Sequence, residues 1–421
     1  MKRLNNISGY ILVAFIYSIS IIISLVTNVS IEVVMKNYQF DVLIILIFME
    51  FFTNLISSTG IMEFLSLKIA KKSLGNKKRI IVLFGLLMFF ISAFLNNITA
   101  VLMILPIVFV MLKTIGINQK YLNIFFASLL ALSNTGGAAS PIGDFPAIVI
   151  MSSGITTFLN YLLRAFPFFF ITSLLILIRW KIVVESNDKT IEQNKLSLDI
   201  LTSKYKNLVV KKDVLIYLII IFIFMFIGWS FVPRRIIPPE IIAVIGYVLA
   251  SVVCAFKKVK IVQTIDFKPI LLISGFLFLA GIISETGFLT DVATILQNNI
   301  TNPKILLIVI MFITSIMSGL FGAGPATSAM MPVVVNLCNT IFINQSSWVA
   351  VAYAASICAG SSLFMWSATA GFVLSKKIND ENLFDENKNI LKWNISNYLK
   401  YGIQNYIIQI IFAIIVMYFI I

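Results

Sequence analysis

The chain has 421 residues, of which 59% are hydrophobic and 12% are charged, and it contains no histidine. A soluble domain carries about 25% charged residues, and a disordered chain combines high charge with few apolar groups. The composition therefore argues against both classes. The formal net charge of +14 does not indicate nucleic-acid binding, because the basic residues lie in loops between apolar runs. Since a spanning helix needs about 20 apolar residues, we expect an all-α polytopic membrane protein.

The predicted membrane segments follow one another with short polar loops. They are 9–27, 41–59, 80–112, 121–151, 155–178, 213–232, 238–256, 269–287, 303–337, 348–374 and 401–421. Two of them, 80–112 and 303–337, are too long for one crossing and have polar or small residues near the middle, at 95–97 and 322–325. We expect each of these two to be a re-entrant hairpin, with a tip that is buried in protein or lines a cavity.

The distribution of basic residues predicts the orientation. With the N-terminus in the cytoplasm and two re-entrant hairpins, most of the 32 basic residues fall in cytoplasmic loops, as the positive-inside rule requires. The exceptions are Lys36, Arg234, Arg235 and Lys304, which fall outside, and Arg164 within a span. We therefore expect a multi-pass protein of the cell membrane, with a cytoplasmic N-terminus and an external C-terminus.

The two halves of the chain resemble each other. The run 40–60 recurs at 267–287, 227 positions later, and each copy leads into an amphipathic stretch, a hairpin, a broken span and a final span. We expect an N-terminal repeat at 1–178, a cytoplasmic linker at 179–212, an unpaired helix at 213–232 and a C-terminal repeat at 233–421. The unpaired crossing inverts the second repeat, and inverted repeats with paired breaks are typical of secondary transporters.

The breaks carry the strongest local signals. Glycine and proline in 133–146 and small residues in 359–362 predict non-helical backbone at membrane depth. There the freed amides and carbonyls need an ion or a substrate, unless the break is a packed kink. At the hairpin tips, Asn96 or Asn97 and Pro325 suit the first positions of helices, whose N-termini attract anions. Neighbouring hydroxyl groups and carbonyls could instead hold sodium.

These arguments select a set of candidate substrate- or ion-binding residues. They are Asn96, Asn97, Thr99, Ser133, Asn134, Thr135, Gly136, Gly137, Asp144, Gly324, Thr327, Ser328, Ser361 and Ser362. Intramembrane charges are few, at Glu50, Asp144, Arg164 and Glu285, and each costs about 2.5–3.5 kcal/mol to insert. Asp144 is the best placed of them for function, although it could simply cap the half-helix that follows. The three cysteines are odd in number and widely spaced, so we expect no disulfide framework and no metal site.

The hairpin 95–107 and the run 133–146 resemble the ArsB/NhaD permease branch of the ion transporter superfamily, which also includes citrate, dicarboxylate and arsenite transporters. The resemblance covers about 40–420. It implies a homodimer of the elevator type, whose mobile transport domain carries the hairpins across the membrane. The substrates it implies are inorganic or carboxylate anions, or sodium exchanged for protons. Two departures weaken the antiporter alternative: Ala147 replaces a frequent Asn, and the tip 322–325 lacks the acidic residue and Asn of many cation antiporters.

We therefore expect an ion-coupled secondary transporter of a small inorganic or carboxylate anion. An enzyme is not expected, because the chain has no histidine and no nucleotide motif. Sodium or a proton is the expected coupling ion, and no other cofactor is expected. The alternative is a sodium/proton antiporter, and a passive channel is disfavoured by the paired breaks. The expected partners are the anion substrate and membrane lipids, with no nucleic acid.

Overall fold

The structure is a computed structural model that describes residues 2–36, 38–185, 210–259, 267–368, 370–385 and 387–421. Within these ranges the chain is helical apart from turns, loops and one isolated bridge between Phe384 and Ile390. The described part has 9 helices that are long and apolar enough to cross a membrane, or up to 11 if each bent pair is one span. The prediction of a polytopic helical membrane protein is confirmed.

The helices follow the predicted segments closely. In the N-terminal half they are α1 (Lys2–Thr27), α2 (Ile31–Lys36), α3 (Phe40–Ser57), α4 (Ile61–Ser73), α5 (Lys77–Ser92), α6 (Asn97–Ile115), α7 (Gln119–Ala139), α8 (Phe145–Ser152) and α9 (Phe158–Val183). In the C-terminal half they are α11 (Lys212–Phe231), α12 (Pro239–Phe256), α13 (Lys268–Glu285), α14 (Phe288–Asn299), α15 (Pro303–Phe321), α16 (Ala323–Thr340), η1 (Ile343–Gln345), α17 (Ser346–Ser361), α18 (Gly371–Asp380) and α19 (Ile395–Ile420).

Polar side chains set several helix starts. Asn118 accepts a hydrogen bond from the backbone N–H of Tyr121, and Thr157 accepts one from Asn160 at the start of α9. Asn302 does the same for Lys304 at the start of α15. Each cap satisfies an N–H group that the helix itself leaves without a partner.

The internal repeat is visible in the packing of α3 and α13. Phe48 and Phe51 of α3 contact Tyr247 of α12, with ring centroids 5.6 and 5.1 Å apart. The position 227 residues after Phe51 is Phe278 of α13, and its ring lies 5.6 Å from Tyr17 of α1. Helix α12 therefore packs on α3 as α1 packs on α13. This arrangement pairs α1 with α12 and leaves α11 without a counterpart.

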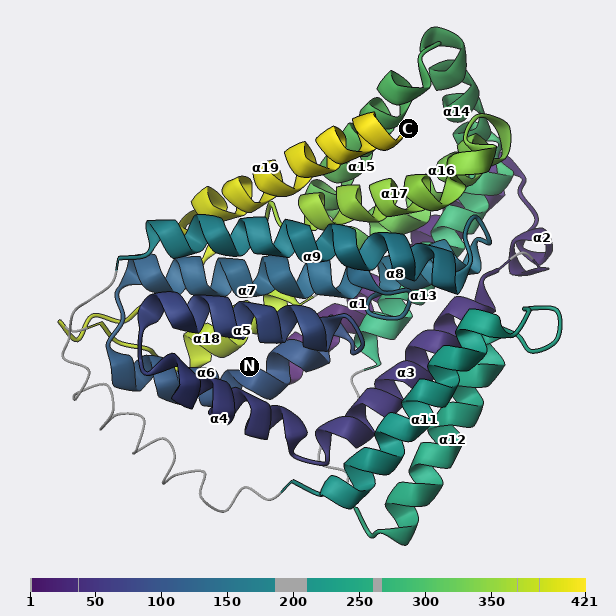
Figure 1. The fold of residues 1–421 in the computed structure, drawn as a ribbon. Coiled ribbons are helices and arrows are strands. Elements are labelled where there is room, and N and C mark those ends of the chain that lie inside the picture. Colours follow the sequence, from purple (N-terminus) through teal and green to yellow (C-terminus); the bar gives the residue numbers. More distant parts are fainter. Residues whose placement is uncertain (1, 37, 186–209, 260–266, 369, 386) are drawn as a thin grey trace.

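The helices form two groups. Figure 1 shows α3, α11 and α12 side by side, and α5, α7, α9, α17 and α19 stacked together in a second group. In the second group the contacts between halves are reciprocal, since α9 packs on α17 and α19 packs on α7. The hairpins and broken helices of both repeats are thus held by one another.

Both predicted hairpins and both predicted helix breaks are present in the structure, but the first break begins later than predicted. Residues 93–96 separate α5 from α6, and Gly322, with φ of +96°, separates α15 from α16. The break expected from 133 begins only at Ser140, because α7 stays helical through its glycines. A Cβ at Gly136 would collide with the Phe89 carbonyl oxygen, so this glycine permits close helix packing instead of ending the helix.

The predicted linker 179–212 is shorter than expected at both ends. Helix α9 continues to Val183, and α11 begins at Lys212. Residues 186–209 lie outside the described part of the chain, so the cytoplasmic position of this segment stays a prediction.

The predicted inversion of the second repeat can be tested on α4 and α14. Lys72 and Asn299 are separated by the repeat offset, since 299 − 72 = 227, and both are exposed. In a background without the native cysteines, we expect an impermeant maleimide to label Lys72→Cys only from the cytoplasmic side and Asn299→Cys only from outside. Labelling of both positions from the same side would contradict the inversion.

Candidate functional site

The first hairpin tip is bonded to the first helix break. The Asn97 amide donates from Nδ2 to Asp144 Oδ2 over 2.8 Å, and the side chain of Asn97 is fully buried. The second carboxylate oxygen of Asp144 accepts the backbone N–H of Phe145 over 2.9 Å and so caps α8. Asn96 caps α6 by accepting the N–H of Ile98 over 2.9 Å. Asp144 therefore caps α8 and binds the tip residue Asn97 at once.

Two glycines allow the break to close around the tip. A Cβ at Gly137 would lie 2.7 Å from Asn97 Oδ1 and 2.8 Å from Asp144 Cβ. A Cβ at Gly143 would lie 2.6 Å from the Ser92 carbonyl oxygen. Because real Cβ atoms do not approach other atoms this closely, both positions require glycine at the observed spacing.

The second tip is bonded to the second break in a similar way. The backbone N–H of Ala323, the first residue of α16, donates to the Ser367 carbonyl over 3.1 Å. The Ser367 hydroxyl accepts the N–H of Phe364 over 3.2 Å, which holds the segment between α17 and α18 in place. Each tip therefore rests on the break of its own repeat.

The helix N-termini of the two repeats meet between the tips. Helix α8 packs on α16, and a Cβ at Gly324 would lie 3.8 Å from the ring of Phe145. Since Phe145 begins α8 and Asp144 binds the start of α6, the N-termini of α6, α8 and α16 converge. The N–H groups of Ile98, Phe145 and Ala323 already have acceptors, but helix ends of this kind still carry partial positive charge. The arrangement is suited to bind an anion.

A hydrogen bond joins the two repeats directly. Asn134 donates from Nδ2 to the Ser361 hydroxyl over 3.0 Å, and the two residues are 227 positions apart. The Cys358 thiol donates to the Asn134 carbonyl over 3.3 Å. This bond joins a position of α7 to its own counterpart in α17, so the pseudo-twofold axis relating the repeats passes between them.

Several of the remaining candidate residues have hydrogen-bond partners nearby. The Thr135 hydroxyl bonds Ser173 of α9 over 2.8 Å, and the Thr327 hydroxyl donates to the Ala323 carbonyl in its own helix over 2.6 Å. Gln409 of α19 donates to the Ser362 hydroxyl over 2.8 Å. Further hydrogen bonds join Ser133 to Ser92 over 3.3 Å and Thr99 to Glu50 over 2.7 Å. Five of the candidate residues thus lie at the tips: Asn96, Asn97, Gly137, Asp144 and Gly324. Asn134 and Ser361 lie at the axis, and the Thr135 side chain points toward α9.

Two tyrosines that the sequence pattern does not single out bond the carbonyls at the breaks. The Tyr161 hydroxyl of α9 donates to the Ala138 carbonyl over 2.8 Å, and the Tyr398 hydroxyl of α19 donates to the Ser362 carbonyl over 2.7 Å. Each bonds a carbonyl near the end of a broken helix, but their separation in sequence, 398 − 161 = 237, differs from the repeat offset. A fixed offset could not have paired them.

A cavity of about 580 Å³ lies beside α16. Its walls come from α13, α14, α16, the end of α8 and the segment before α3. Ser328 lines it, and the Ser328 hydroxyl and Gln39 Oε1 have no hydrogen-bond partner among the described residues. The cavity size falls in the usual range of ligand sites. Because Ser328 lies about one turn after the start of α16, the cavity extends to the region of the second tip.

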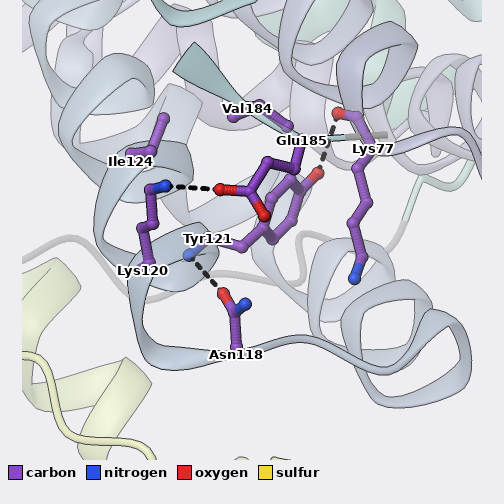
Figure 2. A pocket seen from close by; sticks show the side chains of 7 residues that line it. All are labelled: Lys77, Asn118, Lys120, Tyr121, Ile124, Val184 and Glu185. Carbon is purple, nitrogen blue, oxygen red and sulfur yellow. Dashed lines mark hydrogen bonds and ion pairs between the residues drawn. The ribbon is translucent and has the colours of Figure 1, made fainter. Parts of the chain in front are cut away.

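A smaller hollow of about 30 Å³ lies at the start of α7, far along that helix from the break (Figure 2). Lys120 Nζ lies 2.7 Å from Glu185 Oε1, and this contact holds the pKa of the Glu185 carboxyl below its usual range. The Tyr121 hydroxyl donates to the Lys77 carbonyl over 3.1 Å. Both partners of the ion pair are exposed, and such pairs contribute little. The hollow is too small for a carboxylate substrate.

Comparison with known proteins identifies the family. A family model described as a citrate transporter matches residues 5–358. The chain belongs to the citrate transporter family. An uncharacterized transporter of Mycobacterium bovis is 24% identical over 80% of this chain and 77% of its own length. The magnetosome protein MamN of Magnetospirillum gryphiswaldense is 23% identical over 80% of this chain and 76% of its own. The 46 kDa membrane protein of Mycobacterium leprae is 22% identical over 71% and 69%.

Family membership refines the resemblance seen in the sequence. It supports the ion transporter superfamily and its citrate transporter family, and it does not point specifically to the ArsB/NhaD branch. The protein is thus a multi-pass membrane transporter of citrate-type substrates.

Proposed function

We propose that this transporter is an ion-coupled secondary transporter of a small carboxylate anion, with citrate as the first candidate. The observation that carries the proposal is the convergence of the N-termini of α6, α8 and α16 at two bonded tips and breaks. The partial positive charge at these helix ends can attract the carboxylate oxygens of a substrate. The buried Asn97 Oδ1 has no partner among the described residues, and as an acceptor it suits a substrate hydroxyl group or a coupling cation, not a carboxylate oxygen.

Transport then proceeds by alternating exposure of this site. We infer an elevator-type movement in a homodimer, in which the group containing the hairpins and broken helices shifts against the group of α3, α11 and α12. The cavity beside α16 supports access from one side. The distribution of basic residues assigns that side to the exterior and the N-terminus to the cytoplasm.

A sodium/proton antiporter is the second candidate. The observation that favours it is the pair of carboxylates held by the first tip, Asp144 through Asn97 and Glu50 through Thr99. A buried carboxylate could hold a proton and a sodium ion in turn. An anion site accounts better for the helix N-termini of both repeats, because only the first repeat supplies these carboxylate contacts.

Uptake into proteoliposomes tests the proposal directly. Purified protein is reconstituted, and entry of labelled citrate, succinate, phosphate and arsenite is measured under imposed sodium or proton gradients. We expect citrate to accumulate only when one of the gradients is present. Gradient-independent equilibration would indicate a channel, and lack of entry for all four solutes would contradict the proposal.

Substitution of Asp144 separates the two candidates. Asp144→Asn keeps one oxygen acceptor, which must serve either the Phe145 N–H or the Asn97 amide. In a carboxylate transporter we expect calorimetry to show retained citrate binding, with altered coupling or turnover. If the wild-type protein shows sodium-driven proton flux that Asp144→Asn removes, and no anion binds, the antiporter replaces our proposal.

A further inference from the structure

Helix α3 has a polar face that no part of the proposed anion site uses. Successive residues turn about 100° around the helix axis, which places Glu50, Thr53, Asn54 and Ser57 on one side. Phe48 and Phe51, which pack on α12, are centred about 140° around the helix from this side. The face formed by Glu50, Thr53, Asn54 and Ser57, the α3 polar face, therefore points away from α12 and toward α6.

Three oxygen atoms on the α3 polar face have no hydrogen-bond partner among the described residues. They are Glu50 Oε2, Thr53 Oγ1 and Asn54 Oδ1. The side chains of Thr53 and Asn54 are 1% and 3% exposed, so water does not satisfy them from the surface. The other Glu50 oxygen accepts the Thr99 hydroxyl of α6 over 2.7 Å. Unpaired buried polar atoms are costly, at about 1–3 kcal/mol each.

The three oxygens can point at one place. On a helix, side chains at i, i+3 and i+4 are neighbours, with Cβ atoms about 5–6 Å apart. Thr53 and Asn54 stand at these spacings from Glu50. The set comprises a carboxylate, a hydroxyl and an amide carbonyl, which are the hard oxygen ligands that small cations of the alkali and alkaline-earth groups select. A proton would pair with Glu50 but would leave Thr53 and Asn54 unpaired.

The equivalent face of α13 in the second repeat has different surroundings from the α3 polar face. Its counterparts 227 positions later on α13 are Leu277, Ala280, Gly281 and Ser284, and all four line the cavity of about 580 Å³. That face of α13 borders the cavity opposite α16, where Gly281 and Ser284 are partly exposed and Leu277 and Ala280 are buried. The α3 polar face is instead covered, and the Glu50–Thr99 hydrogen bond fixes α6 against it. The two repeats therefore stand in different states, one open and one closed.

We propose that the α3 polar face is a sodium-binding site that is open to the cytoplasm only when α6 moves away from α3. This inference rests on the alternating exposure in the proposed function and adds the coupling ion and its place. In the closed state α6 isolates the site while the α13 cavity is open. In the alternate state the repeats exchange roles, so α16 closes on α13 and sodium reaches Glu50, Thr53 and Asn54.

Two matched serines report the opening of each face. Ser57 and Ser284 occupy equivalent positions, since 284 − 57 = 227, and neither belongs to the three proposed ligands. In a cysteine-free background, we expect an impermeant thiosulfonate to modify Ser284→Cys from outside. We expect it to modify Ser57→Cys only from the cytoplasmic side, and more slowly. Sodium at ten times its Kd should lower the Ser57→Cys rate about tenfold relative to choline, without changing the rate at Ser284→Cys.

The Glu50→Gln variant tests whether the Glu50 carboxylate binds the sodium ion. The glutamine side chain keeps an oxygen that can accept the Thr99 hydroxyl, so the closed contact survives, while the carboxylate charge is lost. We expect sodium to lose its effect on Ser57→Cys labelling in this variant. A Thr99→Val variant should instead speed cytoplasmic labelling of Ser57→Cys and retain the sodium effect, because it removes the closing hydrogen bond and no ligand.

Several outcomes would overturn the sodium site. These are modification of Ser57→Cys from outside, no modification from either side in any condition, an unchanged rate in sodium, or protection by acid alone. The labelling is measured without any anion. A protein that shows sodium protection at Ser57→Cys but no citrate uptake would therefore contradict the proposed function and leave the sodium site standing.

Discussion

Asn97→Ala is expected to lower citrate uptake about a hundredfold or more. The Asn97 amide donates to Asp144 Oδ2 at a fully buried position, and its own carbonyl oxygen has no hydrogen-bond partner among the described residues. Removing it leaves the Asp144 carboxylate without that donor, and the loss of one partner from a buried charged contact costs about 3–5 kcal/mol. Uptake into proteoliposomes and citrate binding by calorimetry measure the effect.

The neighbouring asparagine provides the matched control. Asn96 caps α6 through the Ile98 N–H, and serine is as good a cap. Asn96→Ser should therefore transport at close to the wild-type rate. Comparable uptake by Asn97→Ala and Asn96→Ser, at equal amounts of monodisperse protein, would move the binding site away from the first tip.

Gly360→Ala is expected to destabilise the protein strongly. A Cβ at this position would collide with the Ser315 carbonyl oxygen of α15 and lie 2.7 Å from Ser318 Cβ. The first obstacle is backbone, so the strain is relieved only if α15 and α17 move apart. Overpacking of this kind costs about 1–3 kcal/mol and occasionally more, and here we expect the upper end. The yield of monodisperse detergent-solubilised protein and its melting temperature measure the loss.

Gly324→Ala separates this effect from a general intolerance of alanine. A Cβ at Gly324 would be 3.8 Å from the Phe145 ring, which is ordinary van der Waals contact. We expect this variant to fold at a normal yield, so any defect in its citrate uptake would report on the site. Equal yields of Gly360→Ala and wild type would show that α15 and α17 can separate at little cost.

Helix positions were predictable because hydrophobicity over long runs decides them. The break at 133–146 was not placed correctly, since glycine has two uses. At Gly136 and Gly137 it permits close contact with α5 and with Asn97, and the helix continues. Only Ser140 to Asp144 leave the helix. Propensity cannot separate these uses, because the neighbour that needs the space lies on another helix.

The residues at the hairpin tips can be predicted from the sequence, but their hydrogen-bond partners cannot. Asn97 and Asp144 were selected separately, for their position near a tip and for charge in the membrane, and the structure adds the hydrogen bond between them. Glu50 was selected as an intramembrane charge, but its contact with Thr99 depends on how α3 meets α6. Such pairings depend on tertiary geometry, which a single sequence does not contain.

The hydrogen bond between Asn134 and Ser361 limits how the two halves can diverge. Most residues lie far from their counterpart in the other repeat, so each can be substituted independently. Glu50 and Leu277 are an example, if the repeats arose by duplication. Where the symmetry axis passes, a residue is its counterpart's direct neighbour. A substitution at such a position directly alters the contact with its counterpart in the other repeat, so the counterpart must change with it. Asn134 and Ser361 are therefore expected to co-vary during evolution, while the sequences of the two repeats diverge elsewhere.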